Sequence, residues 1–158
     1  MNWRRRGLAV IAAGLTFAGC ASSGNPEGTA ESTEGSIPGS PATPGDATRR
    51  IVVEGSDDLR FDPNAIEVAS GETVTFVVRN VGKTKHEFVL GDTEYQEAHE
   101  QEMEEHGHSE ETGNVVEVDP GETAELTWRF DSPGEVLYGC HEPGHYAGGM
   151  VGRVVVGD

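Results

Sequence analysis

The sequence contains few cysteines and few lysines. Its two cysteines, Cys20 and Cys140, are too few for the disulfide framework on which many small secreted domains depend. Lys83 and Lys85 are the only lysines, and the formal net charge of -17 at pH 7 argues against a nucleic acid as partner. Such acidity is compatible with basic proteins, with metal cations, or with a salty medium that screens the self-repulsion.

The sequence also lacks an apolar run long enough for a membrane-spanning helix. Its N-terminus has instead the layout of an export signal, with three arginines at residues 4–6 before thirteen uncharged, mostly apolar residues from Gly7 to Gly19. The arginines followed by a weakly hydrophobic stretch also resemble a twin-arginine signal, so the export route stays open between the general and the twin-arginine pathways.

The end of this signal resembles a bacterial lipobox. In Phe17-Ala18-Gly19-Cys20 the cysteine would carry lipid and become the mature first residue, although Phe stands where Leu is usual. The alternatives are a buried thiol in an ordinary signal and a disulfide with Cys140. Residues 21–49 are dominated by Gly, Ser, Thr, Pro and Glu, which predicts a disordered tether. We therefore expect a signal at 1–20, a tether at 21–49 and an exported domain at 50–158, lipid-anchored on the extracytoplasmic face of a membrane.

From residue 50 onward, apolar and polar residues alternate. The stretches ETVTFVVRN (72–80) and AELTWRF (124–130) each predict a strand with one buried and one wet face. Further candidates are residues 51–54, 65–68, 86–90, 115–118, 135–140 and 150–156. Turn signals rich in Pro, Gly, Asp and Asn separate them. About eight short strands predict an all-β fold, a Greek-key β-sandwich.

One segment, residues 91–114, interrupts this pattern. It holds nine acids between Asp92 and Glu111, and it also carries His99, Met103, His106 and His108. Glu, Gln, Ala and Met favour a short helix at its centre; otherwise the segment is a long mobile loop. It is either a solvated charged insertion or a secondary metal site built from the three histidines and the methionine, with carboxylates concentrating cations around them.

The stretch CHEPGHYAGGM places Cys140, His145 and Met150 at equal intervals of four intervening residues. A thiolate, a thioether and imidazoles suit copper, and two His, one Cys and a weak axial Met form the blue-copper arrangement. Zinc is the rival metal, but it does not explain a thioether. The second imidazole has to come from elsewhere, and His86 opens a predicted strand after the turn at 80–85.

On these residues the chain resembles the cupredoxins, the family of small blue-copper proteins. The four residues between Cys140 and His145 are nearer to azurin-like and rusticyanin-like loops than to the plastocyanin spacing of two. Many cupredoxins have Asn directly after the first His, where this chain has Glu87. The resemblance covers residues 50–158 and implies a Greek-key β-sandwich with one type 1 copper. It implies His86, Cys140, His145 and Met150 as ligands, with Met150 the weak axial one.

Two other histidine patterns have to be separated from this site. His141 follows Cys140 on an extended backbone, so we expect it to point away from the metal. His106-Gly107-His108 resembles the His-x-His element of multicopper oxidases, but a trinuclear site needs several such pairs, so we do not expect an enzyme.

Three functions stay open. We expect a monomeric, membrane-tethered one-electron carrier that serves redox partner proteins. The alternative is an envelope copper-binding protein for copper resistance or delivery, and a third class is a purely structural sandwich.

Overall fold

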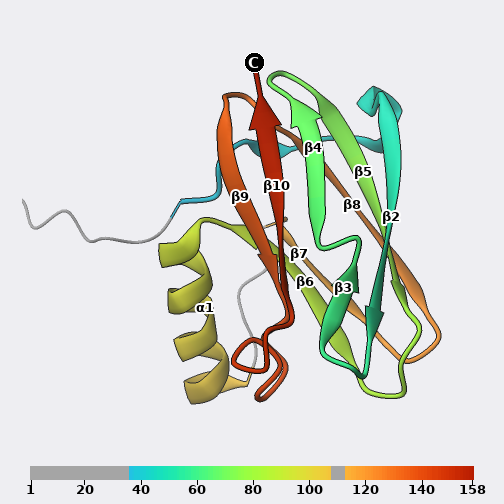
Figure 1. The fold of residues 1–158 in the computed structure, drawn as a ribbon, viewed down its shortest axis with the longest axis vertical. Helices are drawn as coiled ribbons and strands as arrows, with labels where there is room; N and C mark the ends of the chain where they lie inside the picture. Colours follow the sequence, from blue (N-terminus) through green and yellow to red (C-terminus); the bar gives the residue numbers. More distant parts are fainter. Residues whose placement is uncertain (1–35, 108–112) are drawn as a thin grey trace, which may run out of the picture. The chain divides into compact units, whose positions relative to one another are not determined.

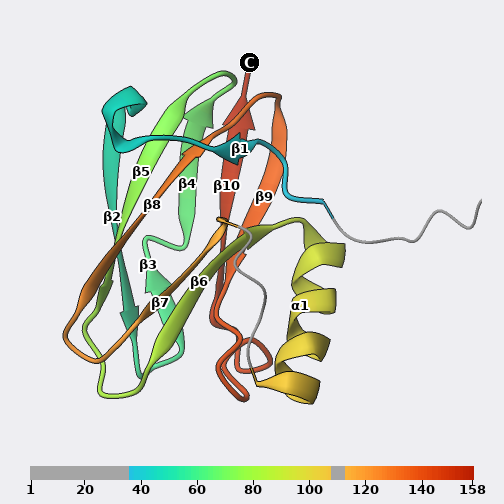
Figure 2. The ribbon, with the colours of Figure 1, turned by 180° about the vertical axis from the view of Figure 1, so that it is seen from behind.

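The computed structural model describes residues 36–107 and 113–158, which form two packed five-stranded sheets (Figures 1 and 2). The first sheet has the order β1 (Ser40–Pro41), β8 (Thr123–Arg129), β5 (Thr73–Asn80), β2 (Arg49–Ser56), β3 (Arg60–Asp62). The second has the order β4 (Ala65–Ala69), β10 (Val151–Gly157), β9 (Gly134–Gly139), β6 (His86–Gly91), β7 (Val115–Val118). The pairs β2–β5 and β4–β10 are parallel, and the remaining pairs are antiparallel.

The predicted β-sandwich is confirmed, and each of the eight expected strands is present. The structure adds two short strands, β1 and β3, and a 3-10 turn at Pro44–Asp46. The sequence placed the start of the domain at residue 50, and described residues before it also pack on the first sheet. There the Pro38 carbonyl accepts a hydrogen bond of 2.9 Å from Trp128 Nε1, and β1 pairs with β8. The predicted signal, Cys20 and residues 21–35 of the predicted tether lie outside the described residues.

An aromatic cluster fills the space between the sheets. Phe88 lies 5.8 Å from Phe61, 5.2 Å from Phe76 and 5.0 Å from Tyr138, measured between ring centroids. All four rings are buried. Such rings contribute large apolar areas and add directional edge and stacking contacts. The cluster therefore packs β3 and β5 of the first sheet against β6 and β9 of the second.

The segment that interrupts the strands forms α1, Thr93–His106, so the structure decides between the helix and the mobile loop for these residues. The Asp92 carboxylate caps its first turn by accepting from the Tyr95 N–H at 2.8 Å, and Gly107 ends it with a left-handed φ of 72°. The helix packs on β6 and β9 (Figure 2), which explains why every residue of β6 is buried on both faces. Within the described ranges, no helix is long and apolar enough to cross a membrane.

Candidate metal centre

Three of the predicted ligands lie where strands of the second sheet begin or end. His86 is the first residue of β6, Cys140 follows β9, and Met150 precedes β10. The loop between Cys140 and Met150 closes on itself at one end of the sandwich (Figure 1). The Cys140 N–H donates to the Met150 carbonyl at 3.1 Å, and the Met150 N–H donates to the His145 carbonyl at 3.0 Å. These bonds bring residues that are ten positions apart to one point.

The side chains converge as the sequence predicted. His86 Nδ1 and His145 Nδ1 are 3.3 Å apart, and the Cys140 Sγ lies 3.8 Å from the first and 3.4 Å from the second. Among the described residues, these three form the one group of three or more His, Cys, Asp or Glu donors whose ligand atoms all lie within 4.8 Å of one another. Both imidazoles therefore present Nδ1, and the thiol completes a three-donor set.

Met150 is fully buried beside this group. Gly55 of β2 borders the site, because a Cβ added there would lie 3.2 Å from the Met150 methyl carbon and 3.5 Å from the His86 ring. The glycine thus leaves room for the thioether and the imidazole together. The thioether of Met150 would serve as the weak axial donor of a blue-copper set.

The surroundings determine the protonation of the donors in the metal-free protein. Burial raises the pKa of the Cys140 thiol to about 12, although the Glu87 N–H donates to Sγ at 3.3 Å and favours the thiolate. Burial, and then the neighbouring His145, lower the pKa of His86, so its ring is neutral at pH 7. The metal-free site therefore carries one thiol proton that a metal has to displace.

Copper affinity should increase with pH because of this proton. Since the thiol pKa of about 12 lies above the working range, the metal-free site stays protonated from pH 6 to 8. Each bound copper then releases one proton, and the apparent affinity rises about tenfold per pH unit. Competition titrations against a chelator of known pH dependence measure this slope. A flat profile, after correction for the chelator, would mean that the thiolate is not a ligand.

The donor set fits copper better than zinc. Thiolate and thioether are soft donors and imidazole is borderline, which matches Cu(I) and Cu(II), whereas a thioether is a poor zinc ligand. His86 Nε2, on the far side of the ring, is buried without a hydrogen-bond partner and lies 3.9 Å from Asp57 Oδ1. A metal on Nδ1 keeps the proton on Nε2, where this carboxylate faces it. Copper bound here would supply a one-electron change between Cu(I) and Cu(II).

The comparison with protein families agrees with this geometry. The family model of the plastocyanin/azurin family of copper-binding proteins matches residues 48–157. The chain belongs to this family. Copper is accordingly the cofactor of this cupredoxin, and His86, Cys140, His145 and Met150 form its candidate type 1 site.

Named relatives and solved structures resemble this cupredoxin over most of its length. The copper-resistant cuproprotein CopI of Rubrivivax gelatinosus is 44% identical, with 72% of this chain and 71% of the relative covered. CopI of Pseudomonas aeruginosa PAO1 is 39% identical, with coverage of 75% and 81%. Reduced auracyanin from Roseiflexus castenholzii superposes with a TM-score of 0.64 at 24% identity, covering 71% of this chain and 99% of that chain, which is a likeness of fold.

The axial position predicts a change in redox behaviour. Replacing Met150 with Gln should keep copper bound to this cupredoxin but lower its reduction potential, because a harder oxygen donor favours Cu(II) over Cu(I). Redox titration followed by visible absorption measures the shift. The matched control is Met103→Gln on α1, which should leave the potential unchanged. Equal reduction potentials in the wild type and in Met150→Gln would mean that Met150 is not the axial ligand.

The structure separates the four residues predicted as a secondary metal site. His99 is 3% exposed and points into the body of the protein, and Met103 lines a pocket beside the ligand loop. His106 has a side chain that is 62% exposed at the last turn of α1, and His108 lies outside the described residues. His99 and Met103 share the inner face of the helix. His106 does not join them there.

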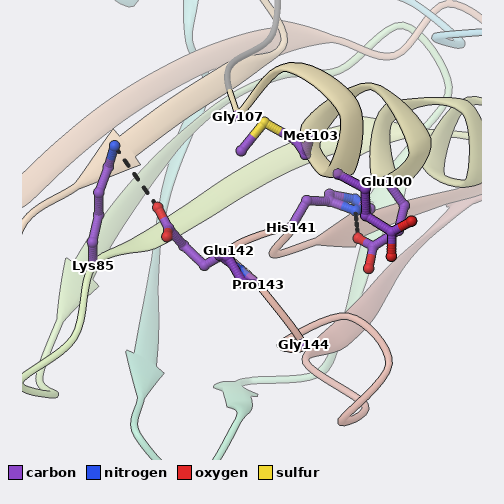
Figure 3. A pocket seen from close by; sticks show the side chains of 9 residues that line it. Lys85, Glu100, Met103, Gly107, His141, Glu142, Pro143 and Gly144 are labelled. Atoms are coloured by element: carbon purple, nitrogen blue, oxygen red, sulfur yellow. Dashed lines mark hydrogen bonds and ion pairs between the residues drawn. The ribbon is translucent and has the colours of Figure 1, made fainter.

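Sequence reasoning missed a polar cluster between α1 and the second sheet. His141 turns away from the copper donors, as expected, and its Nδ1 lies 2.5 Å from Glu100 Oε2 while its Nε2 lies 2.6 Å from Gln96 Oε1 (Figure 3 shows the first contact). The Gln96 amide nitrogen donates to the Val89 carbonyl at 2.8 Å, so its oxygen faces His141. The available signal was the spacing of Gln96, His99, Glu100 and Met103, which places all four on one helical face.

Proposed function

We propose that this cupredoxin binds copper in the cell envelope as part of copper resistance. The observation that carries the proposal is the convergence of His86, Cys140 and His145 on one point beside the buried Met150. Relatives of 44% and 39% identity are named copper-resistant cuproproteins, which favours metal handling over other uses of such a site. The export signal predicted at residues 1–20 supports a location outside the cytoplasm.

A second candidate is a monomeric one-electron carrier that serves redox partner proteins. Strands β6, β9 and β10 and the closed ligand loop hold the donors in place, which limits rearrangement when an electron arrives or leaves. His145 is half-buried and Pro143 and Ala147 next to it are exposed, so an edge of the site is accessible to a partner.

A growth experiment tests the resistance role. A deletion strain of the source organism receives the wild-type gene, the Cys140→Ser gene or no gene, and growth is measured over a series of copper concentrations. We expect Cys140→Ser to resemble the empty strain, because serine cannot supply the thiolate. Full tolerance with Cys140→Ser would contradict the role. Unchanged tolerance in the deletion strain, together with fast reduction and reoxidation of the purified protein, would support the electron carrier instead.

We further propose that lipid on Cys20 anchors the protein to a membrane. Cys20→Ser should move the protein from the membrane fraction to the soluble fraction, because a tether without lipid has no anchor. Fractionation followed by immunoblotting measures the ratio, and Ser22→Ala is a control that leaves the cysteine intact. Continued membrane association of Cys20→Ser would point to an uncleaved signal or to another anchor.

A further inference from the structure

The copper ligands have immediate neighbours that point to the opposite face of the sheet. His86 is followed by Glu87 and Cys140 by His141, and successive side chains of an extended backbone lie on opposite sides. His86 and Cys140 face the copper site, whereas Glu87 and His141 face α1. Glu87 is 1% exposed and His141 is 2% exposed. The same two chain segments therefore present a second set of donor side chains under the helix.

Glu87 meets His99 there without a hydrogen bond. Their facing atoms, Glu87 Oε2 and His99 Nε2, are 3.7 Å apart. Among the described residues, the buried side-chain nitrogen and oxygen atoms without a hydrogen-bond partner are three: these two and His86 Nε2. Burying a carboxylate oxygen and an imidazole nitrogen without a hydrogen bond costs folding free energy. A group bound between the two atoms would offset this cost.

The separation of the two atoms suits a shared metal ion. Nitrogen and carboxylate donors about 2.1 Å from one ion are about 3.0 Å apart at the right angle of a tetragonal site, and about 4.2 Å apart when they lie opposite each other across the ion. The 3.7 Å between Glu87 Oε2 and His99 Nε2 lies in this range, and it is longer than a hydrogen bond. The two donors are thus already spaced as ligands of one ion.

A third donor and an entrance adjoin this pair. Glu100 follows His99 on α1, and in the metal-free structure its carboxylate contacts His141 Nδ1 at 2.5 Å and does not lie within 4.8 Å of both donors of the pair. Glu100 and His141 also line a pocket of about 480 Å³ between α1 and the ligand loop, together with Met103 (Figure 3). Lys85, the cation at this pocket, lies 2.8 Å from Glu117 and 3.7 Å from Glu142.

We propose that Glu87 and His99 form a second metal site for a divalent first-row ion such as Cu(II), which Glu100 would complete by turning its carboxylate from His141 toward the ion. Imidazole nitrogen and carboxylate oxygen suit Cu(II), which binds such donors more tightly than its neighbours in the series. The ion enters through the pocket beside Met103. This site goes beyond the proposed function, and it uses only His99 of the secondary set predicted from the sequence.

Copper stoichiometry and electron paramagnetic resonance test the site. The full chain is loaded with excess Cu(II) alone, passed over a chelating resin and analysed for copper per chain. We expect two coppers, one with the strong visible absorption of a thiolate site and one with an ordinary tetragonal signal. Glu87→Gln and His99→Gln should each weaken the second copper at least tenfold and keep the visible absorption, which also reports that the variant is folded.

The matched control is His106→Gln, which removes an exposed histidine from the same helix and should retain both coppers. In a Cys140→Ser background the tetragonal copper should remain, and it should again be lost with His99→Gln. One copper per wild-type chain, a second copper retained in His99→Gln, or one lost in His106→Gln would each overturn the proposal. None of these outcomes depends on the growth experiment, so the second site and the resistance role fail separately.

Discussion

Replacing Cys140 with serine removes the visible absorption of the copper-loaded protein. The strong colour of a blue-copper site comes from the bond between the thiolate and the metal, and an alcohol cannot supply that bond. The substitution changes one atom of a fully buried side chain, so the sandwich should persist. Copper affinity should fall by more than the roughly 10–100-fold that the loss of an outer-shell partner costs. Absorption spectra and competition titrations measure both effects.

The chain provides a matched control for this substitution. Cys20→Ser makes the same chemical change at the other cysteine, and the colour should be retained there. Visible absorption that survived in Cys140→Ser would contradict the ligand assignment. Loss of colour in Cys20→Ser would show that the N-terminal cysteine takes part in the site.

Replacing Phe88 with alanine should destabilise the metal-free protein by about 3–5 kcal/mol, the usual cost of removing a buried Phe side chain. The ring is 0% exposed, and it contacts Phe61, Phe76 and Tyr138, which come from three other strands. This loss is a large part of the 5–15 kcal/mol that stabilises an ordinary domain. Thermal and denaturant unfolding of the metal-free protein measure it.

Val155→Ala is the control, because Val155 lies in the same sheet but is 40% exposed. It should cost less than about 1 kcal/mol. Because copper binds the folded state, it should recover part of the lost stability, by about 2.7 kcal/mol at a hundredfold excess over Kd. Equal unfolding free energies for Phe88→Ala and Val155→Ala would mean that the aromatic cluster does not hold the sheets together.

The strands were predictable where burial alternates along the chain, but β5, for which the sequence also predicted one wet face, is buried at every residue except Arg79. Strands β4 and β10 alternate in burial along their whole length, which is the pattern that a period of two detects. β1 has two residues inside a Pro- and Ser-rich stretch, and β3 has three residues, which is too short for a period to be visible. Both strands pair with neighbours at a sheet edge, so tertiary contacts determine them.

The copper site was predictable because three of its donors lie in one short loop. Only His86 had to be placed by topology, and its position at the start of a strand made that possible. The cluster under α1 was not predictable from the hydrophobic pattern, because the inner face of this helix is polar, and only the spacing of its polar residues pointed to a shared face. Gln96 and His99 stand where an amphipathic helix would carry apolar residues, so a hydrophobic pattern gives no sign of which face is buried.

The hydrogen bonds of Ser36 have a consequence for the attachment of the molecule. The Ser36 N–H donates to Asp92 Oδ2 at 2.8 Å, and the Asp92 N–H donates to the Ser36 carbonyl at 2.9 Å. Asp92 follows the end of β6 that is remote from His86, so Ser36 lies beside the start of α1, the length of β6 away from the copper ligands. A protein held on a surface by the residues before Ser36 would therefore be attached at a point separate from its copper ligands, and the attachment itself would not cover them.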